Sequence, residues 1–198
     1  AAWGDYDNDQ DFDLYLANWG VNRLYNNDEN FFTNVADIQN VESEELSNGV
    51  SWGDYNNDGM LDLWTSNIRN PDDVYINVGD GTWDITSSPQ FLSATQDVIS
   101  GDTNGDGWLD VFAAGLKMVN GPEGAKFTSL LYKNVTTDSS MVTNNWLKIR
   151  LEGSKSNITN GGWSVQSNRS AIGARVVLHL SDQDIMREVI AGKGHGNM

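Results

Sequence analysis

Short apolar runs separated by turn residues characterise the N-terminal part of the chain. Leu14–Ala17, Leu63–Thr65 and Val111–Ala114 are each bounded by Asn, Gly or Asp, a pattern typical of short β-strands. The Asp80-Gly81 pair predicts a tight hairpin. No stretch carries convincing start and stop signals for a helix. The pattern therefore predicts an all-β fold.

The strand pattern recurs along the chain. Three segments align without gaps, and their first aspartates are 49 and then 48 residues apart. A Tyr-x-Asn anchor follows each segment, and the third anchor is displaced by residues 117–129, which are predicted to form an insertion. Short strands repeated at this period suit a four-stranded blade of a β-propeller. A β-sandwich would not explain a loop that recurs at a fixed period. The anchors are Tyr25 to Asn27, Tyr75 to Asn77 and Tyr132 to Asn134.

Each segment contains an aspartate-rich loop: loop 1 (residues 5–13), loop 2 (54–62) and loop 3 (102–110). Numbered from the first aspartate, positions 1, 3, 5 and 9 of every loop carry oxygen-bearing side chains. A tightly curled loop can turn alternate side chains toward one centre, and Ca²⁺ accepts several oxygen ligands, commonly including a backbone carbonyl. Position 7 is predicted to supply that carbonyl. The predicted ligands are Asp5, Asp7, Asp9, Asp11 and Asp13; Asp54, Asn56, Asp58, Met60 and Asp62; and Asp102, Asn104, Asp106, Trp108 and Asp110.

Positions 6 and 8 shape these loops. Gly59 and Gly107 at position 6 permit a sharp bend. Loop 1 has Gln10 in place of this glycine but carries five aspartates, so the sequence specifies its geometry least well. Position 8 is always apolar, as if it pinned the loop onto a core; its residues are Phe12, Leu61 and Leu109.

Other interpretations of the loops fit less well. Asp and Asn also build turns without any ion, but three matching sets of crowded carboxylates favour a bound cation because like charges repel. An EF-hand loop requires a bidentate acid at position 12, where this chain has Leu16, Thr65 and Ala113. Mg²⁺ suits a cage of several carboxylates less well than Ca²⁺ does.

Composition narrows the classes of function. Twelve Lys and Arg against 28 Asp and Glu leave a net charge of −16, which argues against nucleic-acid binding because phosphates require a basic surface. The chain has no cysteine, so disulfides, thiolate metal sites and a cysteine nucleophile are excluded. No apolar run is long enough to span a membrane. His179, assigned to packing within a strand, and His195 form no evident catalytic pair.

The repeats resemble FG-GAP or VCBS repeats, the integrin-like propeller blades in which D-x-D-x-D-G-x-x-D loops hold calcium. The resemblance rests on the loop spacing and the blade period and covers roughly residues 1–135. It implies that the loops lie in hairpins between strands. Such propellers usually have about seven blades, so the three blades here are expected to form an incomplete ring. The chain is therefore expected to be a fragment, or to complete its ring with another copy.

The C-terminal part resembles the ASPIC/UnbV domain of the cartilage acidic protein family. The resemblance rests on residues 145–153, 168–176 and 187–192. The chain departs from that pattern by an apparent insertion at residues 158–167, and it ends at Met198, before the domain would normally finish. Val176–Leu180 and Glu188–Ile190 are predicted to pair as strands. The predicted domains are the propeller repeats (1–140) and a partial ASPIC/UnbV-like domain (141–198).

Tryptophans offer a second class of candidate residues. Trp3 and Trp52 occupy the same repeat position and are predicted to pack in the core, whereas Trp83 and Trp163 are candidates for stacking on a ligand. Together these patterns predict a secreted or cell-surface calcium-binding protein that binds a protein or carbohydrate partner and is not an enzyme. A calcium-dependent polysaccharide lyase or hydrolase and a structural spacer in a larger secreted polypeptide are the alternatives.

Overall fold

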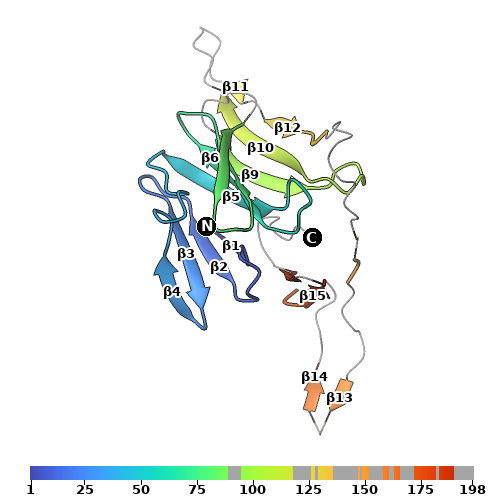
Figure 1. Cartoon of the computed structure of the whole chain (residues 1–198). Helices are drawn as coiled ribbons and strands as arrows, with labels where there is room; N and C mark the ends of the chain where they lie inside the picture. The colour runs from blue at the N-terminus through green and yellow to red at the C-terminus, as the bar shows by residue number, and fades with distance from the viewer. Residues whose placement is uncertain are drawn as a thin grey trace.

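A computed structural model shows the chain as a set of small antiparallel sheets (Figure 1). It describes residues 1–88, 95–117, 126–127, 129–135, 147, 149–151, 158–160, 163–165, 172–181 and 183–189. All regular structure in these ranges is β-strand, which confirms the all-β prediction. In the same ranges, no helix is long and apolar enough to cross a lipid bilayer.

Three repeat sheets follow one another along the chain. In sheets 1 and 2 the strands pair in sequence order. In sheet 3 the second strand is central and pairs with the other three. Sheet 1 comprises β1 (Ala2–Gly4), β2 (Asp13–Leu16), β3 (Arg23–Asp28) and β4 (Phe31–Asn34). Sheet 2 comprises β5 (Ser47–Gly53), β6 (Asp62–Asn67), β7 (Asp73–Asn77) and β8 (Trp83–Ser87). Sheet 3 comprises β9 (Thr95–Gly101), β10 (Asp110–Lys117), β11 (Lys126–Phe127) and β12 (Leu130–Tyr132).

The strand predictions agree with these sheets. The three apolar runs lie in β2, β6 and β10, with only Ala17 beyond the end of its strand, and Asp80 and Gly81 lie in the turn between β7 and β8. Loops 1, 2 and 3 each connect the first two strands of their sheet, β1–β2, β5–β6 and β9–β10. The insertion predicted at residues 117–129 lies largely outside the described residues.

The sheets pack face to face because side chains alternate between the two faces of each strand. On one side, Tyr15 and Leu24 of sheet 1 share a core with Trp52 and Leu63 of sheet 2, with the Tyr15 and Trp52 rings 6.2 Å apart edge to face. The opposite face of sheet 2 packs on sheet 3 and forms a second core. There Trp64 and Val74 meet Val111, and the Trp64 ring lies 5.4 Å from that of Tyr132. Within the described residues, the three sheets form an open stack and not a closed ring.

Two predictions about tryptophan are wrong. Trp52 is buried, but Trp3 is 47% exposed because its face of sheet 1 has no described sheet against it. Trp83, predicted to be free for a ligand, is buried between repeats, with its ring 5.9 Å from that of Tyr6. The prediction for Trp163 is not tested, because its side chain is not among those that the structure describes.

Two hairpins follow the repeat sheets. The first pairs β13 (Ile158–Asn160) with β14 (Trp163–Val165), inside the predicted insertion. The second, the C-terminal hairpin, pairs β15 (Arg175–His179) with β16 (Asp184–Glu188). The first predicted strand here is confirmed. The second is misplaced, because β16 ends at Glu188, where the predicted strand begins. His179 is not packed as predicted: its side chain is 74% exposed and pairs with Asp184 at 2.8 Å. Residues 136–146, around the predicted domain boundary, lie outside the described residues.

Candidate metal centre

All three loops adopt the same backbone curl. Position 4 has a positive φ in each loop, 58° at Asn8, 57° at Asn57 and 79° at Gly105. Position 6 does as well, at 76°, 94° and 89°, and its residues are Gln10, Gly59 and Gly107. Positive φ suits Gly and is tolerated by Asn, but it strains Gln. Loop 1 therefore keeps the common backbone path despite the missing glycine.

Position 1 closes the curl from inside. Its carboxylate accepts a hydrogen bond from the N–H of position 6 in every loop. The donor–acceptor distances are 3.2 Å for Gln10 to Asp5, 2.9 Å for Gly59 to Asp54 and 3.2 Å for Gly107 to Asp102. The first aspartate is therefore held by the turn that the sixth residue makes.

Position 9 joins the start of each loop to β3 in sheet 1, to β7 in sheet 2 and to the segment after β12 in sheet 3. One carboxylate oxygen accepts the N–H of position 2, and the other accepts the N–H of the asparagine in the Tyr-x-Asn anchor. Asp13 accepts from Tyr6 at 3.1 Å and Asn27 at 2.9 Å, and Asp62 accepts from Tyr55 at 2.7 Å and Asn77 at 2.9 Å. Asp110 accepts from Thr103 at 3.2 Å and Asn134 at 2.9 Å. The Tyr-x-Asn anchor therefore recurs with the loop because its asparagine N–H binds the carboxylate at position 9.

Positions 3 and 5 differ between the loops. In loop 2, the Asn56 amide donates to Asp58 at 2.8 Å, and in loop 3 the Asn104 amide donates to Asp106 at 2.6 Å. In loop 1 both positions are aspartates, and neither can donate in this way. Asp7 instead accepts from Asn26 Nδ2 at 2.7 Å.

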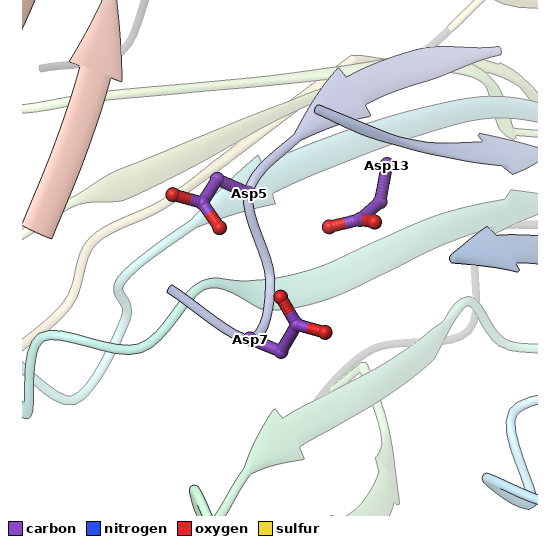
Figure 2. A group of neighbouring side chains, drawn as sticks. All are labelled: Asp5, Asp7 and Asp13. Carbon is purple, nitrogen blue, oxygen red and sulfur yellow. The ribbon is translucent and has the colours of Figure 1, made fainter. Parts of the chain in front are cut away.

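Loop 1 brings three carboxylates together. One oxygen each from Asp5, Asp7 and Asp13 lies within 4.8 Å of the others, and Figure 2 shows the three side chains arranged around a common space. Asp5 and Asp13 are buried, whereas Asp7 is exposed. Among the described His, Cys, Asp and Glu residues, loops 2 and 3 contain no such group of three.

The electrostatics of loop 1 show the cost of this crowding. Burial, followed by the nearby Asp9 and Asp7 carboxylates, raises the pKa of Asp5 to about 6. Burial raises the pKa of Asp13 to about 8, against the hydrogen bonds from Asn27 and Tyr6. In addition, Asp5 Oδ1 is buried with no hydrogen-bond partner. An unpartnered buried carboxylate oxygen is costly, and a cation in this space would remove that cost.

The corresponding groups of loops 2 and 3 are not alike. Burial raises the pKa of Asp62 to about 8 and also raises that of Asp54. At Asp110 burial acts in the same direction, but the Thr103 hydroxyl and the Asn134 and Thr103 N–H groups outweigh it, and the pKa lies below its usual value. Loop 2 therefore resembles loop 1, whereas loop 3 has a stabilised carboxylate at position 9.

That position 7 supplies a backbone carbonyl to the ion stays a prediction. The N–H groups of Asp11, Met60 and Trp108 donate to the position-5 carboxylates at 2.8, 2.8 and 2.9 Å, respectively. These bonds place the residues at the turn. The side chain of Asp11 accepts from Glu29 N at 3.0 Å.

Asparagines that are not among the predicted ligands connect successive loops. Position 4 of one loop donates to the position-6 carbonyl of the next: Asn8 Nδ2 to Gly59 O at 3.4 Å, and Asn57 Nδ2 to Gly107 O at 3.1 Å. In the opposite direction, Asn77 Nδ2 donates to Tyr6 O at 2.8 Å. The recurrence of Asn at position 4 in two loops was the available signal.

The C-terminal hairpin contacts loops 1 and 2. Gln183 Oε1 accepts from Asn8 Nδ2 at 3.3 Å, and Arg187 Nη2 donates to Gly59 O at 3.4 Å. A Cβ atom at Gly59 would lie 2.9 Å from Ile185 Cδ1. Position 6 of loop 2 therefore favours glycine, both for its φ and for the close approach of this hairpin.

Comparison with known proteins identifies the repeats. The profile of the FG-GAP-like repeat matches residues 5–65 and 54–113, so each match runs from the first aspartate of one loop to a strand of the following sheet. Together the two matches cover more than half of the chain. No curated protein matches the chain. The profile covers loops 1, 2 and 3, all of sheet 2, sheet 1 from β2 onward, and sheet 3 as far as the first half of β10. The chain belongs to the FG-GAP-like repeat family.

Proposed function

We propose that this chain is an extracellular binding module whose repeat loops are held rigid by Ca²⁺. The observation that carries the proposal is the set of Asp5, Asp7 and Asp13 oxygens within 4.8 Å, next to a buried Asp5 oxygen that has no hydrogen-bond partner. Carboxylate oxygens are the ligands that Ca²⁺ prefers. The residues of loop 1 therefore fit the ion.

In loop 1, Asp5, Asp7 and Asp13 would hold the ion, with Asp9 and the carbonyl of Asp11 as further predicted ligands. A bound Ca²⁺ would neutralise carboxylates that otherwise repel one another. The chain itself positions them: the Gln10 N–H holds Asp5, and the Tyr6 and Asn27 N–H groups hold Asp13. The same backbone curl in loops 2 and 3 supports the proposal of one ion per loop.

The proposed role is binding and not catalysis. FG-GAP-like repeats are consistent with an adhesion or binding role, and the weak affinity of extracellular calcium modules, about 10⁻⁴–10⁻³ M, suits exposed loops of this kind. The partner would be a protein or a carbohydrate. The FG-GAP-like match ends at residue 113. We propose in addition that the C-terminal part of the chain is an ASPIC/UnbV-like domain.

Thermal unfolding in millimolar Ca²⁺, in Mg²⁺ and in chelator tests the calcium proposal, because a ligand that binds only the folded state raises its stability. We expect a Ca²⁺-specific rise in Tm that decreases in Asp5→Asn. Asp28→Asn, a change at an exposed strand end, is the matched control and should retain the rise. An equal Tm in all three media would refute the proposal.

The binding role needs a separate measurement. A panel of acidic glycans and extracellular-matrix proteins, immobilised with and without Ca²⁺, should retain the chain only with Ca²⁺ and without chemical change. Cleavage of a glycan would favour the lyase or hydrolase alternative, and no retention on any member would favour the spacer.

A further inference from the structure

The C-terminal hairpin places an arginine against position 6 of loop 2. Arg187 lies on β16 and is half-buried, and its guanidinium donates to Gly59 O at 3.4 Å. Its positive charge acts on Asp5 of loop 1 and on Asp54 of loop 2, lowering the pKa of both carboxyls against the effect of burial. Burial in turn lowers the pKa of Arg187, and the two carboxylates oppose that shift.

Further contacts fix the hairpin in this place. Gln183 accepts from Asn8 of loop 1, and Gln10 Nε2 donates to Asp184 at 3.4 Å. Ile185 packs so closely on Gly59 that no Cβ could fit there without a shift. These contacts come from both loops, so the hairpin is seated across the pair and Arg187 is held between them.

We propose that Arg187 is an internal counter-ion for loops 1 and 2 and that the docked C-terminal hairpin thereby weakens cation binding at these two loops. A fixed positive charge near a divalent site repels the arriving ion, and in a partly buried place solvent screens this repulsion incompletely. Because coupling free energies are reciprocal, cation binding at these loops loosens the hairpin. The hairpin is therefore a latch that responds to the divalent cation.

Loop 3 is an internal control. Within the described residues, no hydrogen bond or ion pair joins the C-terminal hairpin to loop 3, and the charge of Arg187 acts on Asp54 and Asp5. Asp102, the equivalent carboxylate, is held by N–H groups of its own loop, Gly105 at 2.6 Å and Asp106 at 3.1 Å. Removal of Arg187 should therefore leave the cation affinity of loop 3 unchanged.

The inference rests on the proposed calcium function, and its test uses the full chain with Arg187→Met. Arg175→Met is the matched control: it removes the same charge from the same hairpin, but Arg175 pairs with Glu188 at 2.8 Å and lies 5.1 Å from the centre of the Phe12 ring. Ca²⁺ is titrated while the amide signals of Gly59 and Gly107 are followed by NMR, because these N–H groups bond the first aspartates of loops 2 and 3.

We expect Arg187→Met to tighten Ca²⁺ binding at Gly59 about three- to tenfold at low salt, with no change at Gly107 and little change in Arg175→Met. Unchanged or weaker binding at Gly59 would overturn the proposal. Hydrogen exchange of β15 and β16 provides a second measurement: addition of Ca²⁺ to the wild type should speed exchange, and equal or slower exchange would contradict the latch.

Failure of the proposed calcium function can be distinguished from failure of the Arg187 proposal. If the wild type binds no Ca²⁺, the proposed function fails, and exchange measured in chelator decides the role of Arg187 alone. Faster exchange of β16 in Arg187→Met than in Arg175→Met would support the counter-ion role. Equal exchange in the two variants would overturn it.

Discussion

Loops 1 and 3 share a backbone path but differ in electrostatics. In loop 1, Asp5 and Asp13 are 1% and 0% exposed, the pKa of each is raised, and Asp5 keeps an unpartnered oxygen. In loop 3, Asp102 is half-buried, Asn104 donates to Asp106, and the pKa of Asp110 is lowered.

The difference arises from what lies against each loop. Asn77 of sheet 2 bonds to the Tyr6 carbonyl of loop 1, and the C-terminal hairpin contacts the same loop. Loop 3 has no following repeat sheet among the described residues. A loop motif therefore determines the backbone path, whereas the neighbouring sheet and hairpin determine the state of the carboxylates.

The largest expected effect comes from position 9. Asp13→Ala leaves the buried N–H groups of Tyr6 and Asn27 without an acceptor, which should lower the free energy of unfolding by about 4 kcal/mol. Asp110→Ala should cost about half as much because Thr103 and Asn134 are more exposed and water can replace the carboxylate. Urea unfolding in chelator measures both. Equal losses of unfolding free energy in the two variants would contradict the proposal that the neighbouring sheet and hairpin determine the state of the carboxylates.

The second effect is a dependence on pH without Ca²⁺. Burial raises the pKa of Asp13 and Asp62 to about 8, above the unfolded value of 3.8. Between these values the folded state binds more protons, so its stability is highest at low pH and is lost as pH rises toward 8. From pH 5 to pH 8 we expect a loss in chelator of about 3.5 kcal/mol for each of the two carboxyls.

Calcium should reverse this trend, because the ion binds the deprotonated carboxylates. Urea titrations at pH 5, 6.5 and 8, with and without Ca²⁺, measure the two slopes. A rise in stability between pH 5 and pH 8 in chelator would contradict the raised pKa values.

The third effect is on affinity. Asp7→Asn removes one charge from the loop 1 cluster and should weaken Ca²⁺ binding there about tenfold, or about 1.4 kcal/mol. Asn104→Asp gives positions 1, 3, 5 and 9 of loop 3 the same charges as in loop 1 and should strengthen its binding a few-fold. Calorimetric titration measures both variants. An unchanged loop 3 affinity in Asn104→Asp would show that charge at position 3 does not distinguish the loops.

The smallest effect concerns position 6. Gln10 has φ 76°, so Gln10→Gly relieves backbone strain and should stabilise the fold by about 0.5 kcal/mol after the entropy cost of glycine. Gly107→Gln makes the reverse change in loop 3 at φ 89° and should destabilise by about 1 kcal/mol. Urea midpoints measure both. A destabilised Gln10→Gly would mean that the Gln10 contact with Asp184 outweighs the strain.

Local features of this chain were predictable from sequence. The apolar runs at residues 14–17, 63–65 and 111–114 formed strands, and the Asp-rich segments formed loops between them, because hydrophobic alternation and turn chemistry act within a few residues. The strained path of Gln10 escaped prediction, since the shared curl of the loop overrides the preference of one side chain.

Features set by distant contacts were not predictable in this way. Trp3 and Trp52 share a repeat position, yet only Trp52 has a described sheet packed on it. Arg187 stands 128 residues after Gly59, and no local pattern indicates that the two meet. Of the predicted ligands, the structure brings Asp5, Asp7 and Asp13 together; the others remain predictions.

The asparagine contacts between loops give the stack a direction and a mode of cooperation. Because the Asn8 amide bonds to loop 2 and the Asn57 amide bonds to loop 3, opening any one loop breaks hydrogen bonds in its neighbour. Such a molecule behaves as a one-dimensional array in which nearest-neighbour terms supply much of the stability. Its repeats should melt as one cooperative unit, and a defect in the middle repeat should disturb both of its neighbours.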